Sequence, residues 1–238
     1  MKLEGSIALV TGANRGLGQA LVAALVEAGA AKVYAAARDE RMIAADGSRV
    51  VALKLDTTNP EQIAAAVRRA SDITLLVNNA GVATSANVLA ASREAIDADF
   101  RTNVHGTLAV IKAFLPVLER AREGATIVNV LSLVSLGSFP ALGGYSASKA
   151  AAYSITQALR PELKGKGIDI LAALPGPIDT DMVKHLAMPK QSPADVAKGL
   201  LAGVERGDEE IFPDPVAQQM GALWNQSHKE FERAFASF

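Results

Sequence analysis

The chain alternates short apolar runs with helical patterns along most of its 238 residues. Seven runs have the length and composition of buried strands, at 6–11, 32–37, 50–55, 73–78, 125–131, 168–174 and 210–213. Helical patterns lie between most of them, at 16–29, 60–71, 92–121, 145–165 and 193–206. Such alternation is typical of parallel βαβ units, and no linker or repeat divides the chain. The sequence therefore predicts one α/β domain over 1–238 on a doubly wound parallel sheet, with only a small helix between Asp39 and Asp46.

The first strand-like run leads through a glycine-rich turn into a helical pattern. Glycines let a backbone approach a pyrophosphate closely, and the N–H groups that open a helix favour negative charge. The spacing is G-x-x-x-G-x-G, which differs from the G-x-G-x-x-G dinucleotide fingerprint. The turn predicts a dinucleotide phosphate site, with contacts from Gly12, Asn14, Arg15, Gly16, Leu17 and Gly18.

A second chemical pattern is Tyr145 and Lys149, with Ser132 thirteen residues before the tyrosine. Residues four apart on a helix share a face, so the Lys149 ammonium is expected near the Tyr145 phenol. A phenol titrates near ~10 in water, and a neighbouring cation lowers that pKa. The pattern predicts proton transfer to or from a carbonyl compound. Alone, the short pattern Y-x-x-x-K is far more often part of an ordinary amphipathic helix, so the prediction depends on the other motifs.

Further motifs follow the later strand-like runs: Asn78-Asn79-Ala80-Gly81, Asn103, and Pro175-Gly-Pro-Ile-Asp-Thr180. Together with T-G-x-x-x-G-x-G, Ser132 and Y-x-x-x-K, their order and spacing resemble the short-chain dehydrogenase/reductase family over residues 5–213. The resemblance implies a Rossmann-type sheet of about seven strands with helices on both faces. It also implies a homodimer or homotetramer.

The resemblance implies a role for each catalytic candidate. Tyr145 exchanges a proton with the substrate oxygen, and Ser132 orients that oxygen. Lys149 hydrogen-bonds the nicotinamide ribose, and Asn103 holds a water that links Lys149 to solvent. Further cofactor contacts are implied at Asp56, Thr57, Asn79, Ala80, Gly81, Pro175, Gly176, Ile178 and Thr180, in addition to Tyr145 and Lys149.

The end of the second strand-like run bears on which cofactor is bound. An acidic side chain there selects the ribose hydroxyl of NAD, whereas an arginine suits the 2'-phosphate of NADP. Arg38 occupies this place, and positions 35–37 hold no acid. Arg15 could supply a second guanidinium, so NADP(H) is predicted. Asp39 leaves the alternative open, because it could reach a ribose hydroxyl if the strand ends one residue later.

The predicted substrate segments are apolar, which favours a hydrophobic ketone or aldehyde. Ordinary core or interface packing would explain the same composition. The candidates are Ser132, Leu133, Val134, Phe139, Leu142, Met182 and Leu186, with Val82, Val183 and Met188 beside them.

The sequence favours an NADPH-dependent carbonyl reductase over two alternatives. A 3-oxoacyl-carrier-protein reductase would need a basic rim for its acidic partner, and the segments around the cleft offer little beyond Lys184, His185 and Lys190. A non-enzymatic NADP(H) sensor would not need Asn103, Ser132, Tyr145 and Lys149 together.

Composition excludes several other classes. The net charge is −1, and the basic residues are scattered, which argues against a nucleic-acid partner. No apolar run approaches the ~20 residues of a membrane span, and no signal-peptide pattern precedes the first strand, so a cytoplasmic protein is expected. The chain has no cysteine, and its three histidines lack metal-ligand spacing, so no metal is predicted.

The last segment, 214–238, is predicted to be a helical tail. Apolar side chains recur there at three- and four-residue steps, which on one helix over 216–237 would form a single stripe. The stripe either packs on its own subunit or crosses to a neighbour and borders that subunit's cleft. Its members are Met220, Leu223, Trp224, Ser227, Phe231, Phe235 and Phe238.

Overall fold

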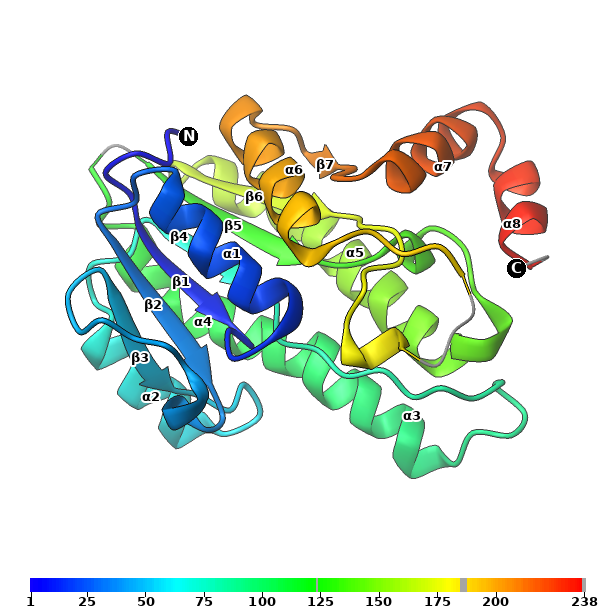
Figure 1. Cartoon of the computed structure of the whole chain (residues 1–238), viewed down its shortest axis with the longest axis horizontal. Helices are drawn as coiled ribbons and strands as arrows, with labels where there is room; N and C mark the ends of the chain where they lie inside the picture. Colours follow the sequence, from blue (N-terminus) through cyan, green and yellow to red (C-terminus); the bar gives the residue numbers. More distant parts are fainter. Residues whose placement is uncertain (123, 185–187, 237–238) are drawn as a thin grey trace.

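The computed structural model describes residues 1–122, 124–184 and 188–236, and a parallel sheet forms its centre (Figure 1). The sheet has seven strands in the order β3-β2-β1-β4-β5-β6-β7. The strands are β1 (Ile7–Thr11), β2 (Lys32–Ala37), β3 (Val50–Lys54), β4 (Leu75–Asn78), β5 (Ala125–Val130), β6 (Ile168–Ala173) and β7 (Glu210–Ile211). This confirms the predicted doubly wound α/β fold with about seven strands.

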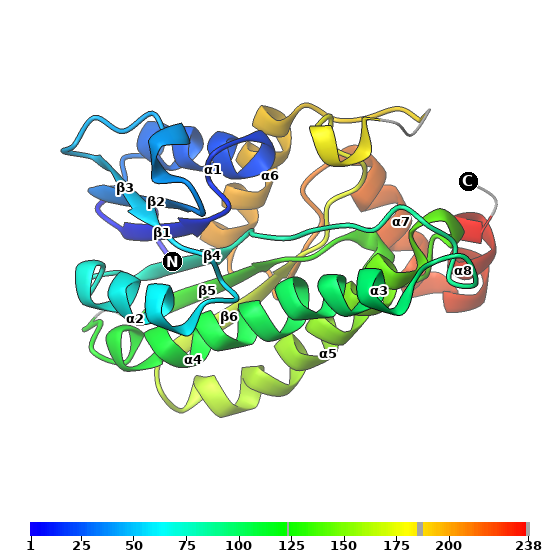
Figure 2. The same ribbon diagram turned by 90° about the horizontal axis from the view of Figure 1, so that it is seen from below.

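Helices cover both faces of the sheet (Figure 2). On one face lie α1 (Gly16–Glu27) and α6 (Pro193–Arg206), and on the other lie α2 (Pro60–Arg69), α4 (Thr107–Leu118) and α5 (Gly143–Lys164). Strand residues point to alternate faces, so Ala8 and Val10 of β1 join the first hydrophobic core and Leu9 joins the second. This explains why the strands read as continuous apolar runs.

Side-chain caps fix the start of several helices. The side chain of Asn59 accepts a hydrogen bond from Gln62 N (3.0 Å) ahead of α2, and Ser192 accepts one from Asp195 N (3.1 Å) ahead of α6. A 3-10 turn over Glu40–Met42 occupies the short crossover between β2 and β3, as expected. None of the described helices is both long and apolar enough to span a bilayer.

The predicted helix over 92–121 is not regular. It consists of α3 (Arg93–Phe100), a π-helical turn at Arg101–Gly106, and α4. Hydrogen bonds of the buried Asn103 side chain to neighbouring segments accompany the wider turn. π turns are rare in general and frequent at functional sites.

The C-terminal tail is helical, but it folds as two helices instead of the single helix over which the apolar stripe was drawn. They are α7 (Pro215–Gln226) and α8 (His228–Ala236), separated at the extended Ser227. The Ser227 hydroxyl accepts a hydrogen bond from Glu230 N (3.3 Å), which favours a new helix start there. Met220, Phe231 and Phe235 are buried against this same chain. Phe238 lies outside the described residues.

Candidate active site

A cavity of about 600 Å³ opens at the carboxyl ends of the central strands. Its walls come from the turn after β1, the ends of β2 and β3, the segments after β4, β5 and β6, and the tail. Ligands of open parallel α/β sheets bind at this edge. The cavity therefore lies where the sequence motifs converge.

The glycine turn is held closed by the segment that follows β4. Thr11 Oγ1 accepts hydrogen bonds from the backbone N–H groups of Asn79 and Ala80 (3.0 Å each), and Asn79 Nδ2 donates to Thr11 O (2.9 Å). A Cβ atom at Gly18 would lie 2.1 Å from the Gly12 carbonyl oxygen, so only glycine fits there. No side chain caps the start of α1. Its first N–H groups are therefore available to an anion in the cavity.

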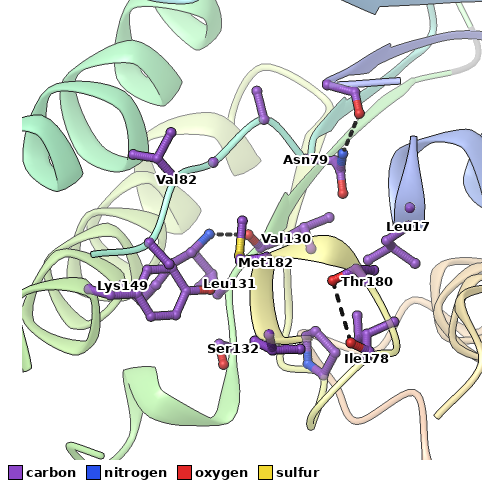
Figure 3. Close-up of a pocket in the computed structure, with 18 of the residues that line it drawn as sticks. Leu17, Asn79, Val82, Val130, Leu131, Ser132, Lys149, Ile178, Thr180 and Met182 are labelled. Carbon is purple, nitrogen blue, oxygen red and sulfur yellow. Dashed lines mark hydrogen bonds between the residues drawn. The ribbon is translucent and has the colours of Figure 1, made fainter. Parts of the chain in front are cut away.

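Ser132, Tyr145 and Lys149 converge on the cavity beside this turn. Lys149 Nζ donates a hydrogen bond to Val130 O (2.7 Å; Figure 3). It also lies 5.7 Å from the centre of the Tyr145 ring. The Ser132 hydroxyl is hydrogen-bonded to the Tyr145 phenol. Tyr145 is half-buried and lines the cavity, whereas Lys149 is only 5% exposed.

Burial determines the protonation of this pair. It raises the pKa of Tyr145 well above its ordinary value, and the charge of Asp99 raises it further, although the hydrogen bond with Ser132 lowers it. Burial also lowers the pKa of Lys149 to about 8. The expected lowering of the phenol pKa by Lys149 is not found: burial dominates the shift, and the opposing contribution comes from Ser132. Tyr145 therefore keeps its phenolic proton near neutral pH.

Lys149→Met is expected to increase the free energy of unfolding near pH 7 by about 1–3 kcal/mol. Because the pKa of Lys149 is lower in the folded protein, only the unfolded chain binds this proton between about pH 8 and the ordinary lysine pKa. The destabilisation is thus complete below about pH 8 and fades as the pH rises through that window. Loss of the donor to Val130 O offsets part of the gain.

Urea unfolding of both proteins, near pH 7 and near pH 10, tests this expectation. The advantage of the variant should shrink at the higher pH. A variant that is less stable than the parent near pH 7 would contradict the prediction.

Both the oxygen and the nitrogen of the Asn103 side-chain amide form hydrogen bonds. Its Oδ1 accepts from Val82 N, and its Nδ2 donates to Val82 O and to Ser148 Oγ, all at 2.9 Å. The side chain therefore brackets the backbone of the segment after β4. Its expected role in holding a water stays a prediction.

Asp99 is a site residue that the sequence analysis missed. Its side chain is fully buried one helical turn before Asn103, and it accepts a hydrogen bond from Thr84 N (3.1 Å). It raises the pKa of Tyr145, and burial raises its own pKa. The i, i+4 spacing to Asn103 was the available signal. An aspartate on a helix is usually exposed, so that signal is weak.

The end of β2 presents Arg38 to the cavity, beside Asp56 and Thr57. Arg38 is exposed. Burial raises the pKa of Asp56, but hydrogen bonds from Thr58 and, to a smaller extent, the charge of Arg38 lower it below its ordinary value. Asp39 does not line the cavity: both its carboxylate oxygens accept from the Arg41 guanidinium (2.8 Å each). The alternative that Asp39 faces a ribose is therefore not supported.

Arg15 takes a different position from the one expected. Its guanidinium forms an ion pair with Asp181 (3.3 Å), which links the glycine turn to the segment after β6. Both side chains are more than half exposed and both line the cavity. Arg15 could contact a phosphate only in competition with Asp181.

The predicted cofactor and substrate segments reach the same cavity. Its walls include Gly12, Asn14, Gly16, Leu17, Gly18, Asn79, Ala80, Gly81, Pro175, Gly176, Ile178 and Thr180. They also include Leu133, Val134, Phe139, Leu142, Met182, Val82, Val183 and Met188. Leu186 and His185 lie outside the described residues. The sequence analysis missed further lining residues, among them Arg101, Val216, Gln219 and Phe235. The described residues contain no cluster of metal ligands.

Known proteins share this architecture and sequence pattern. A model of the short chain dehydrogenase family matches residues 6–191. The chain is 40% identical to a short chain dehydrogenase from Burkholderia cenocepacia solved in complex with NADP, with a TM-score of 0.93 and 99% of each chain covered. It is 25% identical to a short chain dehydrogenase/reductase from Burkholderia phymatum solved in complex with NAD, with a TM-score of 0.83 and 95% of each chain covered.

A curated relative gives the same assignment. The 3-oxoacyl-acyl-carrier-protein reductase FabG of Vibrio cholerae is 35% identical over 195 residues, which cover 78% of this chain and 79% of the relative. The family match spans most of the fold and includes every motif from the glycine turn to Thr180. The chain belongs to the short-chain dehydrogenase family of oxidoreductases.

Proposed function

We propose that the protein is an NADPH-dependent reductase of small hydrophobic ketones or aldehydes. The proposal rests on one observation: the predicted cofactor-binding residues and the predicted catalytic residues line the same cavity. Arg38 and the glycine turn line one part, and Ser132 and Tyr145 lie beside an apolar wall in another. A dinucleotide along the first part would bring its nicotinamide to the tyrosine.

The residues present fit such a cofactor. Gly18 has no Cβ atom, so a pyrophosphate can come close to the backbone there. The N–H groups at the start of α1, which no side chain caps, can bind its negative charge. Arg38 suits a 2'-phosphate, and Asp39, the acid that follows it in the chain, is held by Arg41. The NADP complex of the Burkholderia cenocepacia relative supports this preference.

Each catalytic side chain has a role that follows from its position. A bound nicotinamide would supply the hydride. Tyr145, which is neutral because burial raises its pKa, donates its phenolic proton to the carbonyl oxygen of the substrate. The Ser132 hydroxyl orients that oxygen and stabilises the developing charge. The Lys149 ammonium adds positive charge near the phenol and favours its deprotonated form after the transfer.

A panel of ketones, aldehydes and 3-oxoacyl thioesters, each with NADPH and with NADH, tests the proposal. Loss of absorbance by the reduced cofactor measures turnover. We expect oxidation of NADPH with apolar ketones or aldehydes and much slower reaction with NADH. Tight binding of NADPH with no turnover of any member would favour the sensor alternative instead.

A 3-oxoacyl-carrier-protein reductase is the second candidate. The similarity to the Vibrio cholerae reductase favours it, and Arg101 adds a cation to the cavity wall that the sequence analysis did not consider. In the same panel, a 3-oxoacyl group carried by an acyl carrier protein would then react far better than the same group on a small thiol. Equal rates would favour the small-ketone reductase.

We also propose that the protein is a homodimer or homotetramer, as the family resemblance implies. The buried aromatic side chains of the tail pack on their own chain. These side chains are therefore not available to a subunit interface, and a neighbouring subunit would meet other residues of the tail or other surfaces.

A further inference from the structure

The side chain of Phe231 packs helix α8 against Gly137, in the segment between Ser132 and Tyr145. Phe231 is fully buried, and a Cβ atom at Gly137 would lie 2.6 Å from its Cε1 atom. Any larger residue at Gly137 would displace the ring or the helix. The tail is therefore attached directly beside the residues that perform the proposed chemistry.

Phe235 lies one helical turn after Phe231, and the two rings stack with their centres 4.8 Å apart. The two rings differ in what they contact. Phe235 lines the cavity and is 8% exposed, whereas Phe231 does not line it. Phe231 thus anchors the helix, and Phe235 presents a ring face or edge to the cavity.

The cavity is lined from elements that lie far apart in the molecule. Phe235 reaches it from α8, whereas Arg38 and Asp56 reach it from the ends of β2 and β3. Both overall views place α8 at the end of the molecule opposite β3 (Figures 1 and 2). Phe235 packs in one apolar cluster with Leu133, Phe139 and Met220, which also line the cavity. A substrate that extends from Tyr145 away from the cofactor meets this cluster.

We propose that the Phe235 ring is the end wall of the substrate compartment and sets the longest apolar chain that a substrate can carry. The proposal deepens the proposed function, since it assumes that the carbonyl group lies at Tyr145 and the remainder of the substrate points towards α8. It can be measured by binding alone, so it does not depend on turnover.

A homologous series of straight-chain methyl ketones measures this limit. Each methylene group that enters an apolar compartment improves affinity about fourfold. The gain ends where the chain meets a wall, so affinity plotted against chain length has a break. In Phe235→Ala the ring is absent, and we expect the break to move to longer chains. Ketones beyond the original break should then gain about fourfold per added methylene.

The experiment titrates each ketone into the NADP⁺-loaded protein, which carries no hydride to transfer, and follows binding by calorimetry. Phe235→Leu is the conservative variant, which keeps most of the apolar contact if the alanine variant is poorly folded, and should shift the break by less. Phe231→Leu is the matched control: it changes the same residue type on the same helix, outside the cavity. It should lower thermal stability and leave the break in place.

Each result decides the proposal. A break that moves in Phe235→Ala and stays in Phe231→Leu supports it, even if no ketone is turned over and the proposed function fails. An unchanged break in both Phe235 variants overturns it, even if ketones are reduced. Equal shifts in the Phe231 and Phe235 variants also overturn it, because helix attachment would then set the limit. A wild-type complex that binds no ketone overturns it as well.

Discussion

Tyr145→Phe is expected to lower turnover of the ketone panel by ~10²–10⁴ or more, with NADPH binding nearly unchanged. The substitution deletes only the phenolic hydroxyl. The ring keeps its place on α5 between the apolar wall and Lys149. What is lost is the proton donor and its hydrogen bond with Ser132. Steady-state kinetics with the best ketone, and a fluorescence titration with NADPH, measure the two effects separately.

Tyr153→Phe is a matched control on the same helix. Its hydroxyl donates to Glu210 Oε1 (3.0 Å), away from the cavity wall. Removal of that hydroxyl is expected to cost some stability and to leave the rate constant for turnover almost unchanged. A folded Tyr145→Phe protein with near wild-type activity would remove Tyr145 from the mechanism and revive the sensor alternative.

Arg38→Ala is expected to remove most of the preference for NADPH over NADH. A charge-assisted contact with the 2'-phosphate contributes roughly 1.5–3 kcal/mol, so the ratio of kcat/KM values should fall by about 10- to 150-fold. The fall should come from NADPH alone, since NADH carries no 2'-phosphate. Arg68→Ala is the control, because Arg68 is an exposed arginine on α2 that does not line the cavity.

Arg15→Ala is expected to have a smaller effect than Arg38→Ala. The Arg15 guanidinium must leave Asp181 before it can reach a phosphate, and the two interactions partly cancel. Equal use of both cofactors by the wild-type protein would show that Arg38 is only an exposed charge at a strand end.

Much of the fold followed from local patterns in the sequence. Buried parallel strands need continuous apolar runs, and the crossover helices need amphipathic segments of sufficient length. These requirements act within a few residues, so the strand ends were predicted closely. The motif residues also reached one cavity, because the carboxyl ends of parallel strands meet at one edge.

Features that depend on tertiary contacts did not follow from the sequence. The break at Ser227 interrupts an apolar stripe that one helix would also satisfy. The pairing of Arg15 with Asp181 joins residues that are far apart in the chain. The pKa of Tyr145 depends on burial, which the i, i+4 rule does not reveal. Helical spacing correctly placed Lys149 beside the ring but could not give the direction of the shift.

Because of the π turn at Arg101–Gly106, the number of residues between α3 and α4 must stay fixed. A regular helix rotates by about 100° per residue, so loss of one residue between α3 and Asn103 would turn the amide away from Val82. The extra residue of the π turn thus sets the rotation of α4 about the helix axis relative to α3. Substitutions on the outer surface of this segment leave that rotation intact, whereas an insertion or deletion destroys it. Families that share this turn should therefore vary here in composition and not in length.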